Sequence, residues 1–173
     1  MQRSDTLIAD NIELIEQGIE LIGQLDDGLY SNTNPRYSMS GVGSHFRHCI
    51  DFYDSFLSGL KSGRINYDAR ERDCRVAVNR AAATRKMNAI IDGLHSLRLV
   101  DGQKDLQVTL ENSVYNDLPV WSRSSVVREL QSLLSHTTHH YALIALALRL
   151  QGFEPCREFG IAPSTLAHLK KAS

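Results

Sequence analysis

The sequence has few of the features that mark membrane, secreted or nucleic-acid-binding proteins. No uninterrupted apolar run approaches the about 18 residues that a membrane-spanning helix needs. The three cysteines are widely spaced and contain no C-x-x-C pair, so they form neither a disulfide framework nor a cysteine zinc site. The formal net charge of −1 gives no electrostatic attraction to nucleic acid or to an anionic membrane. The N-terminal residues lack the basic start and apolar block of a signal peptide, and we expect a reduced, cytoplasmic protein.

Several common catalytic motifs are also missing. There is no Gly-rich phosphate loop, no serine nucleophile elbow and no Glu-x-x-His pair of the kind that di-iron bundles use. A zinc-protease helix needs glutamate directly after its first histidine, and Thr137 stands at that position after His136. Phosphate-loop, serine-hydrolase, di-iron and zinc-protease chemistry are therefore excluded.

Four segments carry apolar residues at helical spacing and are separated by turn signals. The first three cover residues 4–27, 40–60 and about 72–97, with Asp68 and Glu71 as the start signal of the third. The fourth starts at Ser122 or Ser124 and stops at Gly152. No internal repeat or linker divides the 173 residues, so the sequence predicts one all-α domain, 1–173, built from four long helices.

The segment between the third and fourth helices is the least helical part of the chain. Residues 106–110 alternate apolar and polar side chains as a strand does, and a second extended piece is expected over residues 118–121. The sequence therefore predicts a small hairpin or an ordered loop over one end of the helices. Trp121 is expected to be its apolar anchor.

The tail after Gly152 is too apolar to be disordered. Phe153 and Phe159 need a surface to pack on, and Ser164 is placed to cap a last short helix. These side chains either cover the end of the helices or pack on a second copy of the chain. A homodimer is therefore one of the two arrangements that we expect.

The histidines give the clearest chemical signal. His136 and His140 are four residues apart, so they share one face of the fourth helix, and Leu133 and Leu143 on that face indicate that it points inward. A buried polar group without a partner costs about 1–3 kcal/mol, and a metal ion would be a partner for both imidazoles.

The second helix offers a third ligand, since its histidines at positions 45 and 48 both lie on its inward stripe. Three neutral imidazoles on a divalent ion leave a position open, as in catalytic sites. Histidine suits zinc, nickel, copper and iron alike, so the metal is not identified. The alternative interpretation is a set of core histidines bonded to one another or to water.

The stretches Gly43-Ser44-His45-Phe46-Arg47-His48 and His136-Thr137-Thr138-His139-His140 resemble the DinB/YfiT-like superfamily. The resemblance implies a four-helix bundle with up-down-down-up connectivity and one divalent metal ion. It implies His48, His136 and His140 as the ligands, because His48 precedes an apolar-aromatic run as the family's histidine does, with His45 as the alternative. The residues after His140 depart from the Arg-Gly-Gln of many members, and the hairpin and the long tail are not standard.

Relatives in that superfamily include metal-dependent transferases for small thiols, a maleylpyruvate isomerase and the bundle domain of iron-dependent sulfoxide synthases. The resemblance therefore implies a metal-dependent transferase or hydrolase acting on a small molecule such as a thiol. Asp51, Glu129 and Tyr141 are the candidates for a base or a partner of the ligands, although Asp51 is expected at a solvent-facing edge and Glu129 as a solvated residue at a helix start. The alternatives are a non-catalytic metal-binding or stress-related bundle, and a bundle that has lost its metal.

Overall fold

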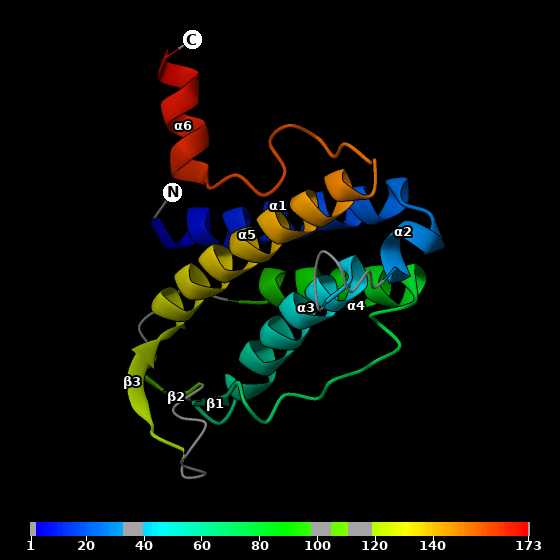
Figure 1. The fold of residues 1–173 in the computed structure, drawn as a ribbon. Helices are drawn as coiled ribbons and strands as arrows, with labels where there is room; N and C mark the ends of the chain where they lie inside the picture. Colours follow the sequence, from blue (N-terminus) through cyan, green and yellow to red (C-terminus); the bar gives the residue numbers. More distant parts are fainter. Residues whose placement is uncertain (1–2, 33–39, 98–104, 111–118, 173) are drawn as a thin grey trace.

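The computed structural model describes residues 3–32, 40–97, 105–110 and 119–172, which form a mostly helical protein with a small sheet (Figure 1). The prediction of a mostly helical protein is therefore confirmed, and the strands form a sheet of three instead of the small hairpin or ordered loop that we expected. The helices in these ranges are α1 (Arg3–Gln24), α2 (Asp27–Ser31), α3 (Val42–Gly59), α4 (Arg80–His95), α5 (Val126–Leu150) and α6 (Pro163–Ala172). The strands are β1 (Arg64–Asn66), β2 (Asp105–Thr109) and β3 (Ser122–Ser125).

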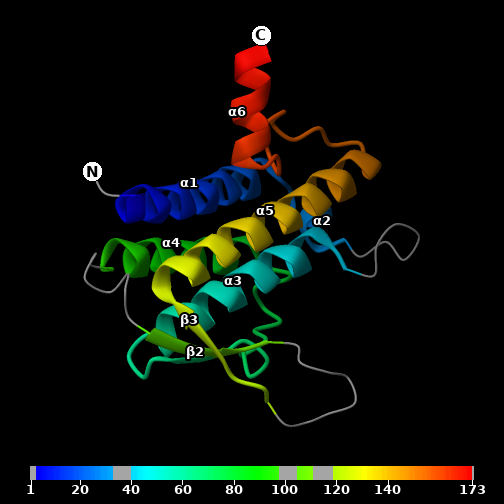
Figure 2. The same cartoon turned by 90° about the vertical axis from the view of Figure 1, so that its left-hand side faces the viewer.

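The core lies between the four long helices. α3 packs on α4 and α5, and α1 packs on the same two helices, as the two views show (Figures 1 and 2). Their apolar stripes meet in a continuous buried cluster that includes large aromatic side chains. The fully buried aromatic residues are Tyr30, Phe46, Tyr53, Phe56 and Tyr141. This packing fixes α3 and α5, which carry the candidate histidines, against each other.

Helix boundaries differ from the predicted ones where side-chain caps decide them. The predicted start of the third helix at Asp68 is wrong, because α4 begins at Arg80 after Asn79, whose side chain accepts a hydrogen bond from the backbone of Ala82. The first helix ends at Gln24 and is followed by the short α2. The fourth begins after Ser125, whose hydroxyl accepts from the backbone of Arg128. Such caps satisfy N–H groups that a helix start leaves free.

The sheet lies at one end of the long helices α3 and α5 (Figure 1). The predicted strand over residues 106–110 is confirmed as β2, which pairs antiparallel with β3. The second strand lies at Ser122–Ser125 instead of residues 118–121, of which 118 is outside the described ranges. β1, which pairs parallel with β2, was not predicted. Trp121 is half-buried under the guanidinium of Arg64, whose Cζ lies 4.2 Å from the ring centroid.

The tail packs on the helices before it leaves them. Phe159 is buried and stacks on Tyr141, with ring centroids 4.6 Å apart. The predicted last short helix is present as α6, but it begins at Pro163, so Ser164 lies inside the helix and the prediction that it caps the start is wrong. In both views α6 stands away from the other helices (Figures 1 and 2). None of the described helices is both long and apolar enough to cross a membrane.

Candidate metal centre

The candidate centre lies where α3 and α5 pack together. His45 and His48 come from the first half of α3, and His136 and His140 from the middle of α5. The interface between these helices therefore brings together side chains that are about 90 residues apart in the sequence, as the 88-residue separation of His48 and His136 shows.

Three of these histidines are close enough to share one ion. His48, His136 and His140 offer ligand atoms that all lie within 4.8 Å of one another, and the Nε2 atoms of His48 and His136 are 3.2 Å apart. Two nitrogens bound to a tetrahedral zinc ion at about 2.0–2.1 Å would be separated by about 3.3 Å. The observed spacing is that of a hydrogen bond between the two imidazoles, and it also fits two ligands of a common ion.

His45 lies on the other side of the His140 ring. The Nδ1 atoms of His45 and His140 are 3.0 Å apart, a hydrogen bond in which one of the two must carry the proton. When Nδ1 of His140 donates to His45, the lone pair on Nε2 of His140 is free for a metal. His45 is thus placed to orient a ligand, in the way that metal-binding histidines are held by a partner on their second nitrogen.

The histidines are half-buried, which corrects the expectation that their face points into the core. The buried stripe of α5 runs through Leu133, Thr137, Tyr141 and Ile144, and the histidines flank it. The ring of Phe52 lies against them, with its centroid 4.3 Å from that of His136 and 4.8 Å from that of His48. The centre therefore has an apolar ring on one side and partial access to solvent.

The protonation state of the cluster suits a metal. Burial lowers the pKa of His48 and of His136 to about 4 and that of His140 to about 3, and the neighbouring histidines add to these shifts. The pKa of His45 is lowered as well, first by burial. All four imidazoles are therefore neutral at pH 7, which is the form that binds metal ions.

Asp51 lies one turn along α3 from His48 and is buried, with 4% of its surface exposed, so the predicted solvent-facing position is wrong. Its Oδ2 atom has no hydrogen-bond partner, and the guanidinium of Arg47 lies 3.8 Å from it. Burial raises the pKa of Asp51 to about 6, although Arg47 opposes the shift. This carboxyl group can therefore exchange a proton near neutral pH.

Glu129 is also buried, at 6% exposure, which contradicts its interpretation as a solvated residue. One of its carboxylate oxygens accepts a 2.8 Å hydrogen bond from the Tyr67 hydroxyl, and the other accepts from the Ser124 hydroxyl. Both oxygens are thus engaged in holding the loop after β1 and the start of α5 together. This residue has a structural role in the described fold.

Tyr141 lies in the core and does not join the histidines. Its ring meets Phe46 edge-on at a centroid distance of 5.7 Å and stacks on Phe159, while its hydroxyl lies beside Gly18 of α1. Burial raises the pKa of this hydroxyl well above its ordinary value, so it does not serve as a base.

Sequence reasoning missed two residues that border the centre. Tyr67 stacks on Phe52 at a centroid distance of 4.9 Å, and Arg70 lies over the same ring with its Cζ 4.9 Å from the centroid. The charge of Arg70 contributes to the lowered pKa of both His48 and His136. Both residues lie between the second and third predicted helices, where no local pattern distinguished them.

No known protein-family model matches the chain. A curated protein named FK506-binding protein 5, from Rhizopus delemar, is 32% identical over 108 residues. The match covers 62% of this chain and 28% of that protein, so the chain spans little more than a quarter of the relative's length. The comparison shows similarity to a part of that protein and does not assign the chain to a family.

Proposed function

We propose that this protein is a metal-dependent enzyme of the DinB/YfiT-like type, with α1, α3, α4 and α5 as its four-helix bundle. The observation that carries the proposal is the convergence of His48, His136 and His140 from two packed helices, with ligand atoms within 4.8 Å of one another. A set of half-buried imidazoles that are neutral at pH 7 is a natural site for a divalent ion of zinc, nickel or iron.

The ion, when bound, would lower the pKa of a water molecule or hold a thiolate in its open position. The chain supplies the surroundings: His45 fixes the ring of His140, and Phe52 keeps one side of the site apolar. We assign the uptake or release of a proton to Asp51, which lies one turn along α3 from His48 and whose pKa is raised to about 6 by burial. These properties favour transfer or hydrolysis of a small substrate such as a thiol.

Elemental analysis of protein purified without a nickel column tests the proposal. We expect about one equivalent of a divalent metal in the wild type and none in His140→Ala, because two imidazoles rarely hold an ion alone. Apo protein offered zinc, nickel and iron(II) should regain one equivalent. If the wild type takes up none of the three metals, the histidines are structural and the proposal fails.

A thiol-transfer and hydrolysis screen of the loaded protein then tests the enzymatic part. Loss of activity on metal removal and in Asp51→Asn, with metal content unchanged in the latter, is the expected result. A fully loaded protein that turns over no substrate in the screen would favour a non-catalytic metal-binding bundle.

A further inference from the structure

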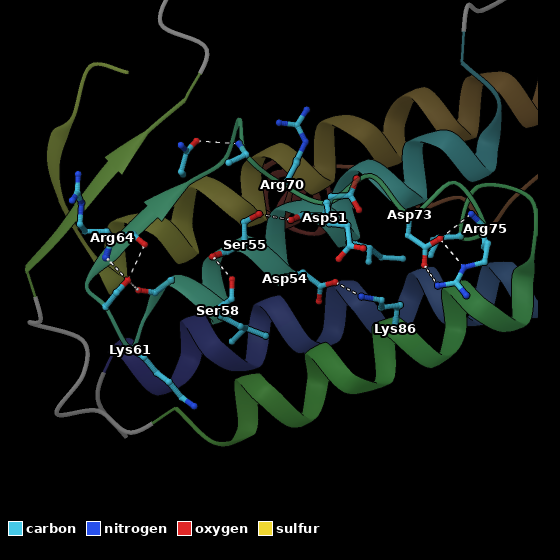
Figure 3. A pocket seen from close by; sticks show the side chains of 18 residues that line it. Asp51, Asp54, Ser55, Ser58, Lys61, Arg64, Arg70, Asp73, Arg75 and Lys86 are labelled. Atoms are coloured by element: carbon cyan, nitrogen blue, oxygen red, sulfur yellow. Dashed lines mark hydrogen bonds and ion pairs between the residues drawn. The ribbon is translucent and has the colours of Figure 1, made fainter. Parts of the chain in front are cut away.

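A charged hollow of about 970 Å³ lies beside α3, bounded by the loop after β1 and by α4 (Figure 3). In this view Asp51 lies near its middle, between Arg64 at one end and Arg75 at the other, and Arg70 lies at its upper edge with the guanidinium pointing away from the other labelled side chains. Most of its lining side chains are polar or charged, so a polar ligand is better suited to it than an apolar one.

Two ion pairs neutralise much of the charge in the hollow. Lys86 lies 2.7 Å from Asp54, and Arg75 lies 2.9 Å from Asp73. Arg70 has no carboxylate within ion-pair distance among the described residues, and its Nε atom is buried without a hydrogen-bond partner. Because the Nε atom is covered, the donors that Arg70 can offer to a ligand are those on its Nη atoms.

Arg70 is also held in a fixed position. One of its Nη atoms donates a hydrogen bond to the backbone carbonyl of Tyr67, and its guanidinium lies over the ring of Phe52. The same ring contacts His136 and His48, so the guanidinium is about one aromatic ring away from the candidate metal ligands. Arg70 therefore borders both the hollow and the histidine centre.

The charge of the centre adds a second reason to expect an anion. Three neutral imidazoles leave the full charge of a divalent ion in place, and Arg70 adds another positive charge beside it. Of the carboxylates that line the hollow without one of these two ion pairs, Asp51 lies against Arg47 and is buried, and Glu71 is exposed. A planar guanidinium fits a carboxylate through two parallel hydrogen bonds.

We propose that Arg70 binds a carboxylate group of the substrate while another group of the same molecule meets the three-histidine site. This inference rests on the proposed function and defines the substrate class as a small carboxylic acid with a second, metal-directed group.

Spectral titration of the protein loaded with Co²⁺ tests the inference without any turnover. Malonate, succinate and glutarate are compared with butyrate, which can reach the ion but has no second carboxylate for Arg70. We expect at least one dicarboxylate to bind the wild type about tenfold or more tighter than butyrate, since a charge-assisted pair is worth that much. Arg70→Gln should lose this advantage while it keeps its Co²⁺ content and its butyrate affinity.

Arg75→Gln is the matched control, because Arg75 lines the same hollow but is 86% exposed and paired with Asp73. It should keep the dicarboxylate advantage within about twofold, since an exposed ion pair contributes little. Arg70→Lys keeps the positive charge but cannot form two parallel hydrogen bonds, so it should retain only part of the dicarboxylate advantage. This variant replaces Arg70→Gln in the test if the glutamine variant does not fold.

The inference is overturned if no dicarboxylate binds the wild type better than butyrate, or if Arg70→Gln keeps the advantage. Either result with a full equivalent of Co²⁺ leaves the metal site standing and removes only the role of Arg70. A wild type that takes up no Co²⁺ overturns both proposals together.

Discussion

Replacing His48 and His45 separately by alanine should have different effects on metal binding. The structure gives the two residues different places, although they lie three residues apart on α3. His48 Nε2 is 3.2 Å from His136 Nε2, and two nitrogens on one tetrahedral ion are expected to be about 3.3 Å apart. His45 instead meets Nδ1 of His140 at 3.0 Å, where it can orient that ring.

The expected magnitudes follow from these places. His48→Ala removes one of three ligands and should abolish stoichiometric binding at micromolar protein. His45→Ala removes only an orienting hydrogen bond, and changes of that kind weaken metal affinity by about 10–100-fold. The His45 variant should therefore still carry close to one equivalent of metal, but release it faster to a chelator.

The assay is metal content by elemental analysis, followed by competition with a chromophoric chelator, on both variants prepared side by side. His95→Asn is the control for the general effect of replacing a histidine, because His95 lies at the end of α4 and outside the centre. Urea unfolding of the apo forms checks that both variants fold. Because the imidazoles are half-buried, replacing one by alanine should lower the free energy of unfolding only slightly.

Two results would refute this reasoning. Loss of metal in His45→Ala with full retention in His48→Ala would exchange the roles of the two residues. A full equivalent in both variants would show that the ion, if bound, is not held by the three-histidine set.

Three further predictions concern the fold. Tyr67→Phe removes a 2.8 Å hydrogen bond to the buried Glu129 carboxylate, so the free energy of unfolding in urea should fall by about 1.5–3 kcal/mol; an unchanged midpoint would mean that another donor replaces the hydroxyl. Gly18→Ala places a methyl group where the Tyr141 hydroxyl and Met87 lie and should destabilise by about 1–3 kcal/mol, whereas Gly23→Ala on the same helix meets no atom within 4 Å and should stabilise by about 0.5–1 kcal/mol; equal thermal midpoints for the two variants would contradict this packing. The histidines of the centre have folded-state pKa values of about 4, 4 and 3, below the ordinary 6.5, so the unfolded chain binds more protons in acid. The contribution of these histidines to the stability of the apo protein is therefore complete above pH 6.5 and is lost as the pH falls towards 4. The urea midpoint should be lower at pH 5 than at pH 7.5, and this drop should be smaller in His140→Ala.

Local patterns in the sequence determined the features that depend on neighbours along the chain. The spacing of four between His136 and His140 placed both on one face of α5, because a helix repeats every 3.6 residues. Alternating side chains identified β2, and apolar stripes identified the four long helices. The capping signal at Asp68 misled because such signals are short and recur outside helices; Asn79 provides the cap that the fold uses.

Only the tertiary structure decided which distant side chains meet. Glu129 is buried because Tyr67, 62 residues away, reaches its carboxylate, and no local pattern at either residue indicates that contact. β1 is a strand because β2 pairs with it, since three residues carry too weak a pattern to specify a strand alone. Arg70 lies in a polar stretch that predicts only a solvated loop, and it borders the histidines because the loop after β1 crosses Phe52. The candidate histidines were therefore accessible from helical periodicity, although only the family resemblance favoured His48 over His45. The groups around them depend on packing between segments far apart in the chain.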